Sequence, residues 1–206
     1  KSDDEKSVSA FAFYPDSLGF DNKPLYVIDA AKVAALSPFK TSKFQPSAAA
    51  IHPKLQKLFI ISSASNQLVV ADLNGVVESV HKLSPKLFPQ PEGITFKQNG
   101  DMYISNEGLS TKSTLLKFTY IAVSEKSKQE ILKSGYNFSI PDDKMELGKH
   151  LKEISGITYV PSTGQMLAQY DEKGDIFTID FNKKNDFNLE KTWIFNHSLW
   201  RRKHSS

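Results

Sequence analysis

Hydrophobic and polar residues alternate in short runs along most of the chain, which is the pattern of half-buried antiparallel strands. In residues 91–108, PEGITFKQNGDMYISNEG, two such runs flank the turn QNGD. Glycine and asparagine favour tight connections of this kind. The alternating apolar positions are Ile94, Phe96, Met102 and Ile104. The segment therefore predicts a β-hairpin with one face toward a core, Ile94 opposite Ile104 and Glu92 opposite Asn106.

The same order of features occurs three times, in residues 47–75, 92–120 and 155–183. Small residues lead into a β-rich run, a turn rich in Pro, Gly or Asn follows, and a second run, a polar loop and a third run complete the unit. An aspartate lies 24 residues after the leading small residue in the first and third units, at Asp72 and Asp180. We interpret these two aspartates as turn or strand-end hydrogen-bond acceptors.

The units begin 45 and then 63 residues apart, and a period of about 40 to 50 residues is typical of a four-stranded propeller blade. The sequence therefore predicts an all-β fold, a β-propeller-type repeat of antiparallel sheets within one domain. The predicted divisions are a partial blade with a short helix at 8–46, blades at 47–90, 91–123 and 151–195, a polar insert or linker at 124–150, and a tail at 196–206.

Three stretches carry a resemblance to a known family: KFQPSAAAIHP, QPEGITFKQNGDMYISNEG and LKEISGITYVPSTGQMLAQYDEKGDIFTID. They resemble the SdiA-regulated (YjiK-like) family of bacterial β-propellers, which is related to the calcium-dependent phytase-like propellers. In that family the LKEISGI unit belongs near the start of the domain and the QPEGI unit near its end, and here the order is reversed. The resemblance therefore implies an incomplete or permuted propeller of about 4 blades, with sheet edges open to self-association.

Carboxylates gather at one end of the predicted hairpins, because the entry and exit of a hairpin share one rim of the sheet. The candidate ligands at this rim are Glu92, Asn106, Glu107, Glu153 and Asp171. Oxygen donors without sulfur or clustered histidine suit Ca²⁺ or Mg²⁺, and the resemblance favours Ca²⁺. The alternative is that each of these side chains is an ordinary solvated strand end.

Composition excludes several other kinds of site. The chain has no cysteine and a net charge of +3 spread along its length, so thiolate metal sites, disulfides and a strong nucleic-acid surface are not expected. No apolar run approaches the roughly 20 residues of a membrane-spanning helix. Catalytic motifs such as GxSxG, GxxxxGK[ST], GxGxxG and HExxH are absent from the sequence. We expect a surface position for His52, in the turn before Pro53, and sheet packing for the aromatic residues Phe59, Tyr103, Phe118, Tyr159 and Phe177.

These observations favour a non-catalytic binding or sensor propeller that holds calcium at its channel rim and presents loops to a small-molecule or protein ligand. The alternative is a calcium-dependent phosphoesterase resembling the phytase-like propellers, in which calcium would bridge the phosphate and activate water. The resemblance also implies an exported protein, periplasmic or at the cell surface.

Overall fold

Three antiparallel sheets of four strands each dominate the fold. The computed structural model describes residues 7–39, 44–108, 112–122, 134–171, 174–179 and 189–193. Asp180 and the predicted tail at 196–206 lie outside the described residues. Within each four-stranded sheet the strands follow one another in chain order, and every neighbouring pair is antiparallel. This confirms the predicted all-β class with a propeller-type repeat.

The first blade comprises β5 (Ala48–Ile51), β6 (Leu58–Ser62), β7 (Gln67–Ala71) and β8 (Val77–Lys82). The second comprises β9 (Pro91–Phe96), β10 (Met102–Asn106), β11 (Thr114–Phe118) and β12 (Asp143–Glu146). The third comprises β13 (Ile154–Val160), β14 (Gln165–Tyr170), β15 (Ile176–Ile179) and β16 (Leu189–Trp193), and the 3₁₀ turn η2 (Lys149–Leu151) precedes it.

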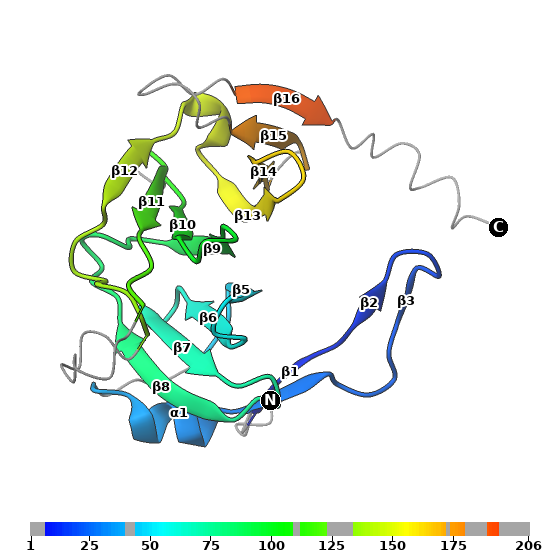
Figure 1. Ribbon diagram of the computed structural model, residues 1–206, viewed down its shortest axis with the longest axis vertical. Helices are drawn as coiled ribbons and strands as arrows, with labels where there is room; N and C mark the ends of the chain where they lie inside the picture. The colour runs from blue at the N-terminus through cyan, green and yellow to red at the C-terminus, as the bar shows by residue number, and fades with distance from the viewer. Residues whose placement is uncertain are drawn as a thin grey trace.

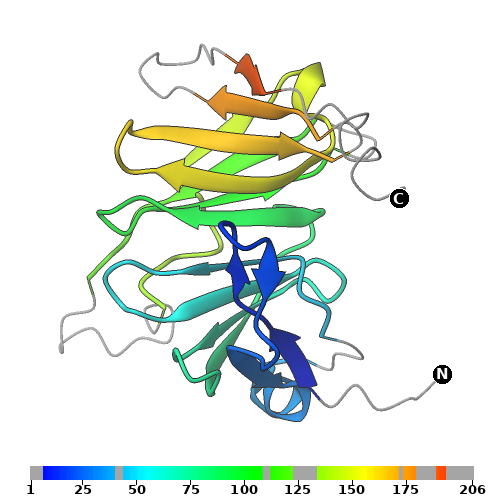
Figure 2. The same ribbon diagram turned by 90° about the vertical axis from the view of Figure 1, so that its right-hand side faces the viewer.

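The three blades form an arc, with β5, β9 and β13 facing its inside and β8, β12 and β16 outside (Figure 1). In the turned view the sheets are stacked as successive layers (Figure 2). The fourth strand of the second blade, β12, comes from residues 143–146, within the range predicted as a polar insert or linker. The sequence DKME has one buried side chain, Met145, among exposed ones. This is too little hydrophobic alternation to predict a strand from the sequence.

The N-terminal segment forms two small ribbons and a helix. Strand β1 (Ser7–Ala10) pairs with β4 (Tyr26–Asp29), and β2 (Phe13–Tyr14) pairs with β3 (Gly19–Phe20) beyond them. Helix α1 (Ala30–Leu36) begins where the Asp29 side chain accepts hydrogen bonds from the amides of Ala31 at 2.8 Å and Lys32 at 3.3 Å. The helix lies alongside β8, and Val33 is its buried residue.

Each interface between neighbouring blades encloses a hydrophobic cluster. One lies between the first and second blades around Phe59, Phe96 and Ile104, and another between the second and third around Tyr103, Met166 and Phe177. A further cluster joins the first blade to α1 and β4 through residues such as Ile60, Val33 and Ile28. The blades are therefore held face to face by apolar packing.

Strand β10 is buried on both faces, so the prediction of a half-buried sheet was wrong for this strand. Met102 and Ile104 point into the cluster shared with the first blade, whereas Tyr103 points into the cluster shared with the third. A sheet covered on both sides needs apolar residues at successive positions, as in the fully buried β6 and β7. The packing roles predicted for Phe59, Tyr103, Phe118 and Phe177 are confirmed, and Tyr159 is half-buried.

Specific hydrogen bonds join the inner strands of adjacent blades. The Ser47 hydroxyl donates to the carbonyl oxygen of Pro91 at 2.8 Å, and the Tyr159 amide donates to the Thr95 hydroxyl oxygen at 3.0 Å. Gly93, on β9, lies so close to β13 that a Cβ there would be 3.1 Å from the Ile157 backbone nitrogen. No helix in the described part of the chain has both the length and the apolar character to cross a membrane.

Candidate functional site

The predicted acidic side chains lie at the rim where each inner hairpin opens. The Glu107 amide donates to the Gln90 carbonyl at 2.9 Å across the mouth of the β9–β10 hairpin, and the Asp171 amide donates to the Glu153 carbonyl at 3.0 Å across the β13–β14 hairpin. The two mouths are joined by a bond from the Gly108 amide to the Lys152 carbonyl at 2.8 Å. We call this region the acidic rim.

The register at the rim differs from the prediction. Ile104 pairs with Ile94 as predicted, but Asn106 pairs with Pro91 and not with Glu92, because a β-bulge follows the Ser105–Gly93 pair. The same irregularity recurs in the third blade, where Ile154 and Gly156 pair with consecutive residues and Ser155 is the extra one. A bulge redirects the side chain of its extra residue, so Glu92 occupies a position that regular alternation does not predict.

Four of the five predicted ligands lie close enough for their charges to interact. Burial raises the pKa of Glu107, and repulsion from Glu92, Glu153 and Asp171 raises it further, while the Lys152 ammonium opposes the shift. Burial also raises the pKa of Glu92, and Asp171 adds to this effect. The rim therefore concentrates negative charge that favours a bound proton or cation.

Neutral side chains stabilise these carboxylates. Hydrogen bonds from Ser63 and Gln90 counteract the rise in the pKa of Glu92, and the Gln90 side-chain amide also donates to the Glu107 carboxylate. Sequence reasoning missed Ser63, Gln90 and Lys152 as rim residues. All three lie just outside strand ends at the same edge, which is the signal that could have identified them.

Asn106 is set apart from the acids by its burial. Its side chain is 1% exposed, and its Nδ2 donates to the Thr114 hydroxyl oxygen at 3.0 Å and to the Leu87 carbonyl at 3.4 Å. The Oδ1 atom is buried without a hydrogen-bond partner among the described residues. Within those same residues, no three acidic or histidine side chains are grouped closely enough to hold a metal ion together.

The prediction of a surface position for His52 was wrong. The side chain is 0% exposed, and its ring lies 4.8 Å from those of Phe96 and Tyr120. Its Nδ1 accepts hydrogen bonds from the amides of Lys54 at 3.1 Å and Leu55 at 3.0 Å. The ring therefore caps the turn after β5 from the inside, and burial lowers its pKa from 6.5 to about 4.

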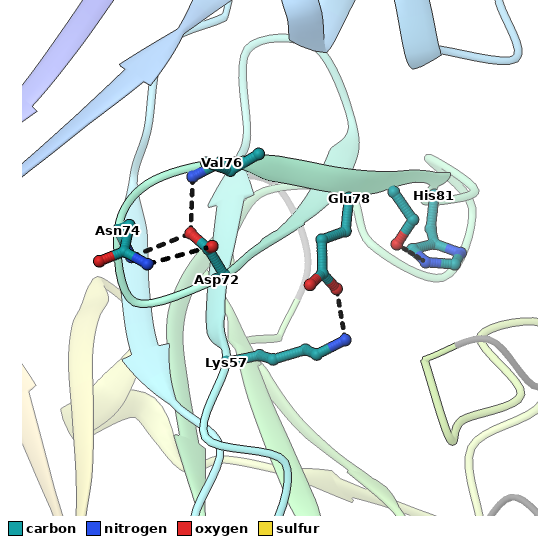
Figure 3. A network of polar contacts seen from close by, with 7 residues as sticks. Lys57, Asp72, Asn74, Val76, Glu78 and His81 are labelled. Atoms are coloured by element: carbon teal, nitrogen blue, oxygen red, sulfur yellow. Dashed lines mark hydrogen bonds and ion pairs between the residues drawn. The ribbon is translucent and has the colours of Figure 1, made fainter.

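A second polar network lies on the first blade (Figure 3). Asp72 Oδ1 accepts from the amides of Val76 at 2.8 Å and Asn74 at 2.9 Å, which confirms its predicted role in a turn. Beside it Lys57 pairs with Glu78, and the Ser79 hydroxyl lies 3.0 Å from His81 Nε2. The turn and the ion pair account for this network as structural contacts of β6, β7 and β8.

Comparisons with known proteins agree with this geometry. Residues 20–109 match the SdiA-regulated family model. The resemblance read from the sequence is thereby confirmed over β4, α1, the first blade and the β9–β10 hairpin. The SdiA-regulated match ends just after Glu107, so it includes Glu92 and Asn106 but neither Glu153 nor Asp171. No curated protein sequence matches the chain.

The likeness to one solved structure supports the propeller-type fold. A streptogramin B lyase structure aligns with a TM-score of 0.51 and 16% identity, covering 95% of this chain and 57% of that one. A virginiamycin B lyase from Staphylococcus aureus aligns with a TM-score of 0.49 and 14% identity, covering 93% of this chain and 57% of that one. The chain thus spans just over half the length of these two proteins. At such identity the likeness shows the fold alone.

Proposed function

We propose that the protein is a non-catalytic, propeller-type binding module that holds a divalent cation at the acidic rim. The observation that supports this is the gathering of Glu92, Glu107, Glu153 and Asp171 at one rim, where burial and the charges of the other three acids raise the pKa of Glu107. Carboxylates that lie close together are costly while all are ionised, and a cation removes that cost. Calcium and magnesium are the ions whose ligand preferences fit such a donor set.

The residues fit an ion held by few direct ligands and by water. The pKa values of Glu92 and Glu107 are both raised, and Gln90 contacts both side chains. We assign them as the direct ligands, with Glu153 and Asp171 contributing charge through bound water. This agrees with the lack of a three-residue acidic cluster in the described ranges. Sites that combine one or two carboxylates with several waters are common for Mg²⁺ and occur among the weaker Ca²⁺ sites.

The test is calorimetric titration of the purified chain with calcium and with magnesium, accompanied by thermal melts. A cation that binds only the folded state should raise the melting temperature. Glu107→Gln should abolish the increase, whereas Glu78→Gln, which removes an acid of the first blade paired with Lys57, should not. A melting temperature unchanged by millimolar calcium and magnesium would contradict the proposal.

A phosphate-release assay with phosphomonoesters, run beside the titration, distinguishes the binding module from an enzyme. If calcium-dependent release of phosphate from phosphomonoesters accompanies binding and disappears in Glu92→Gln, the phosphoesterase alternative is correct. If cation binding occurs without hydrolysis, the binding module is supported. An affinity near 10⁻⁴ to 10⁻³ M would be typical of extracellular calcium modules and would fit the exported location that we propose with this function.

A further inference from the structure

A pocket of about 320 Å³ lies beside the acidic rim, between the ends of the second-blade strands and the start of the third blade. The pocket is formed by the two residues before β11, the last residue of β12 and the segment that contains η2 and leads to β13. The lining residues are Lys112, Ser113, Glu146, Leu147, Gly148, Lys149 and Lys152. We call it the lysine pocket.

The charge of the lysine pocket is opposite to that of the rim. Three lysines line it, and Glu146 is the one acidic residue among the lining residues. Glu146 pairs with Lys112 at 2.7 Å between Nζ and Oε2, at an exposed edge of the pocket. Lys149 and Lys152 are both exposed. The lining therefore carries a net positive charge that attracts anions.

A buried hydroxyl provides a second and independent observation. Ser113 is 1% exposed, lines the pocket, and its Oγ has no hydrogen-bond partner among the described residues. Its backbone is fixed, because its carbonyl accepts the Leu147 amide at 2.9 Å. A buried polar atom without a partner costs free energy, and rotation of the Ser113 hydroxyl toward a ligand atom in the pocket would supply the missing bond.

We propose that the lysine pocket binds the anionic group of a small molecule, a phosphate or a carboxylate, through Lys149, Lys152 and the Ser113 hydroxyl. The volume lies at the lower end of the range for small-molecule sites, so the occupant is a compact anion or the charged end of a slightly larger molecule. Lysine recognises phosphate and carboxylate as a point charge and imposes little geometry. This inference does not depend on cation binding at the rim.

Lys152 connects the lysine pocket with the acidic rim. Its side chain lines the pocket, its carbonyl accepts the Gly108 amide at 2.8 Å, and its charge acts on Glu107. The two sites consequently present opposite charges on one edge of the molecule. A ligand with an anionic group in the pocket would extend past Lys152 toward the cation proposed at the rim.

The test is titration calorimetry with inorganic phosphate, acetate and tetramethylammonium, in EDTA and at an ionic strength of about 20 mM, where surface charges are weakly screened. Phosphate and acetate should bind and tetramethylammonium should not. The double variant Lys149→Gln/Lys152→Gln should weaken phosphate affinity by about tenfold or more. The matched control, Lys23→Gln/Lys32→Gln, removes the same charge from exposed positions of the N-terminal segment and should bind as the wild type does.

Ser113→Ala tests the pocket without changing its charge. It should weaken phosphate affinity by about threefold to tenfold while the melting temperature of the unliganded protein stays the same or rises, since the substitution removes an unsatisfied buried group. Equal affinity in the wild type and both double variants would identify an adventitious ion only and overturn the proposal. Loss of affinity in the control double variant as large as in the pocket variant would overturn it as well.

Discussion

The backbone amide of Tyr159 donates to the hydroxyl oxygen of Thr95 at 3.0 Å, which ties β13 of the third blade to β9 of the second. The Thr95 side chain here satisfies a backbone amide of the neighbouring sheet, although β9 and β13 belong to different sheets. Together with the Ser47–Pro91 bond at 2.8 Å, it gives each interface between blades a directional contact beside its apolar cluster. Apolar packing is non-directional, so alone it would fix the relative register of the blades less strictly than their spacing.

Thr95→Val tests this contact, because it keeps the shape of the side chain and removes the acceptor. The Tyr159 amide then loses its partner, and we expect the free energy of unfolding to fall by about 1 to 2 kcal/mol. Denaturant titration measures the change. Thr158→Val is the matched control, as Thr158 lies on β13 and is exposed, and it should be nearly neutral. Equal effects of the two substitutions would contradict the role of the bond.

Gly93 and Gly156 occupy equivalent places in the second and third blades but differ in the room around them. A Cβ on Gly93 would lie 2.5 Å from Ser105 Oγ and 3.0 Å from Ile157 Cγ1, whereas a Cβ on Gly156 would lie 3.7 Å from its nearest neighbour, Gln169 Oε1. We expect Gly93→Ala to lower the free energy of unfolding by about 1 to 3 kcal/mol.

Gly156→Ala should be tolerated, because ordinary van der Waals contact requires no displacement of its neighbours. Thermal and denaturant melts of the two variants provide the comparison. The first blade already carries alanine at this place, Ala48. If Gly156→Ala destabilised the protein as much as Gly93→Ala, the close approach of β9 to β13 would not be the reason for glycine.

His52 predicts a dependence of stability on pH. Its pKa is about 4 in the folded protein and 6.5 ordinarily, so the unfolded chain binds the proton more tightly. The contribution is therefore fully present above pH 6.5 and is lost as pH falls toward 4, by up to about 3 kcal/mol. His52→Asn preserves an acceptor for the turn amides and removes the titrating ring.

The measurement is the free energy of unfolding of the wild type and His52→Asn at several pH values between 4 and 6.5. The variant is expected to be less stable overall, because the ring fills space among Phe96, Tyr120 and other aromatic residues. The difference between the two proteins should shrink as the pH is lowered. If the difference in free energy of unfolding between the two proteins stayed constant across this range, the predicted pH dependence would not come from a buried, neutral His52.

Glu107 predicts the opposite trend. Its pKa is raised above 4.5 in the folded protein, so its contribution is fully present below pH 4.5 and is lost as pH rises through the folded value. In metal-free buffer at pH 7, Glu107→Gln should therefore be more stable than the wild type. The gain should disappear below pH 4.5, and a destabilised variant at pH 7 would contradict the repulsion described at the rim.

The sequence was sufficient to predict the inner hairpins of the three blades, because a hairpin depends on local patterns. A tight turn after an alternating run specifies a hairpin, and a hairpin places its first and last residues at one edge, which is why Glu92 and Glu107 could be placed together. Burial of β10 on both faces was not predicted, since Ser105 and Asn106 read as polar positions although both are buried.

Three features depended on tertiary context. The bulge that sets Glu92 out of register arises where β9 approaches β13. Gly93 is the residue in PEGITF that could have indicated it, since an isolated glycine within a strand suggests a bulge or a close backbone approach. Strand β12 has one buried residue and joins its sheet after a long excursion from β11. Burial of His52 results from the aromatic residues of the second blade and of the β11–β12 connection, which lie far from it in sequence.

Each apolar cluster lies between two adjacent units, so the described part of the molecule is a linear array of units. Its units differ in the number of clusters that stabilise them. The second blade contributes to two of the clusters, and the third blade to one of them. In such an array, opening a terminal unit breaks one interface, while opening an inner unit breaks two. Amide protons of β9, β10 and β11 should therefore exchange with solvent deuterium more slowly than those of β13 and β14.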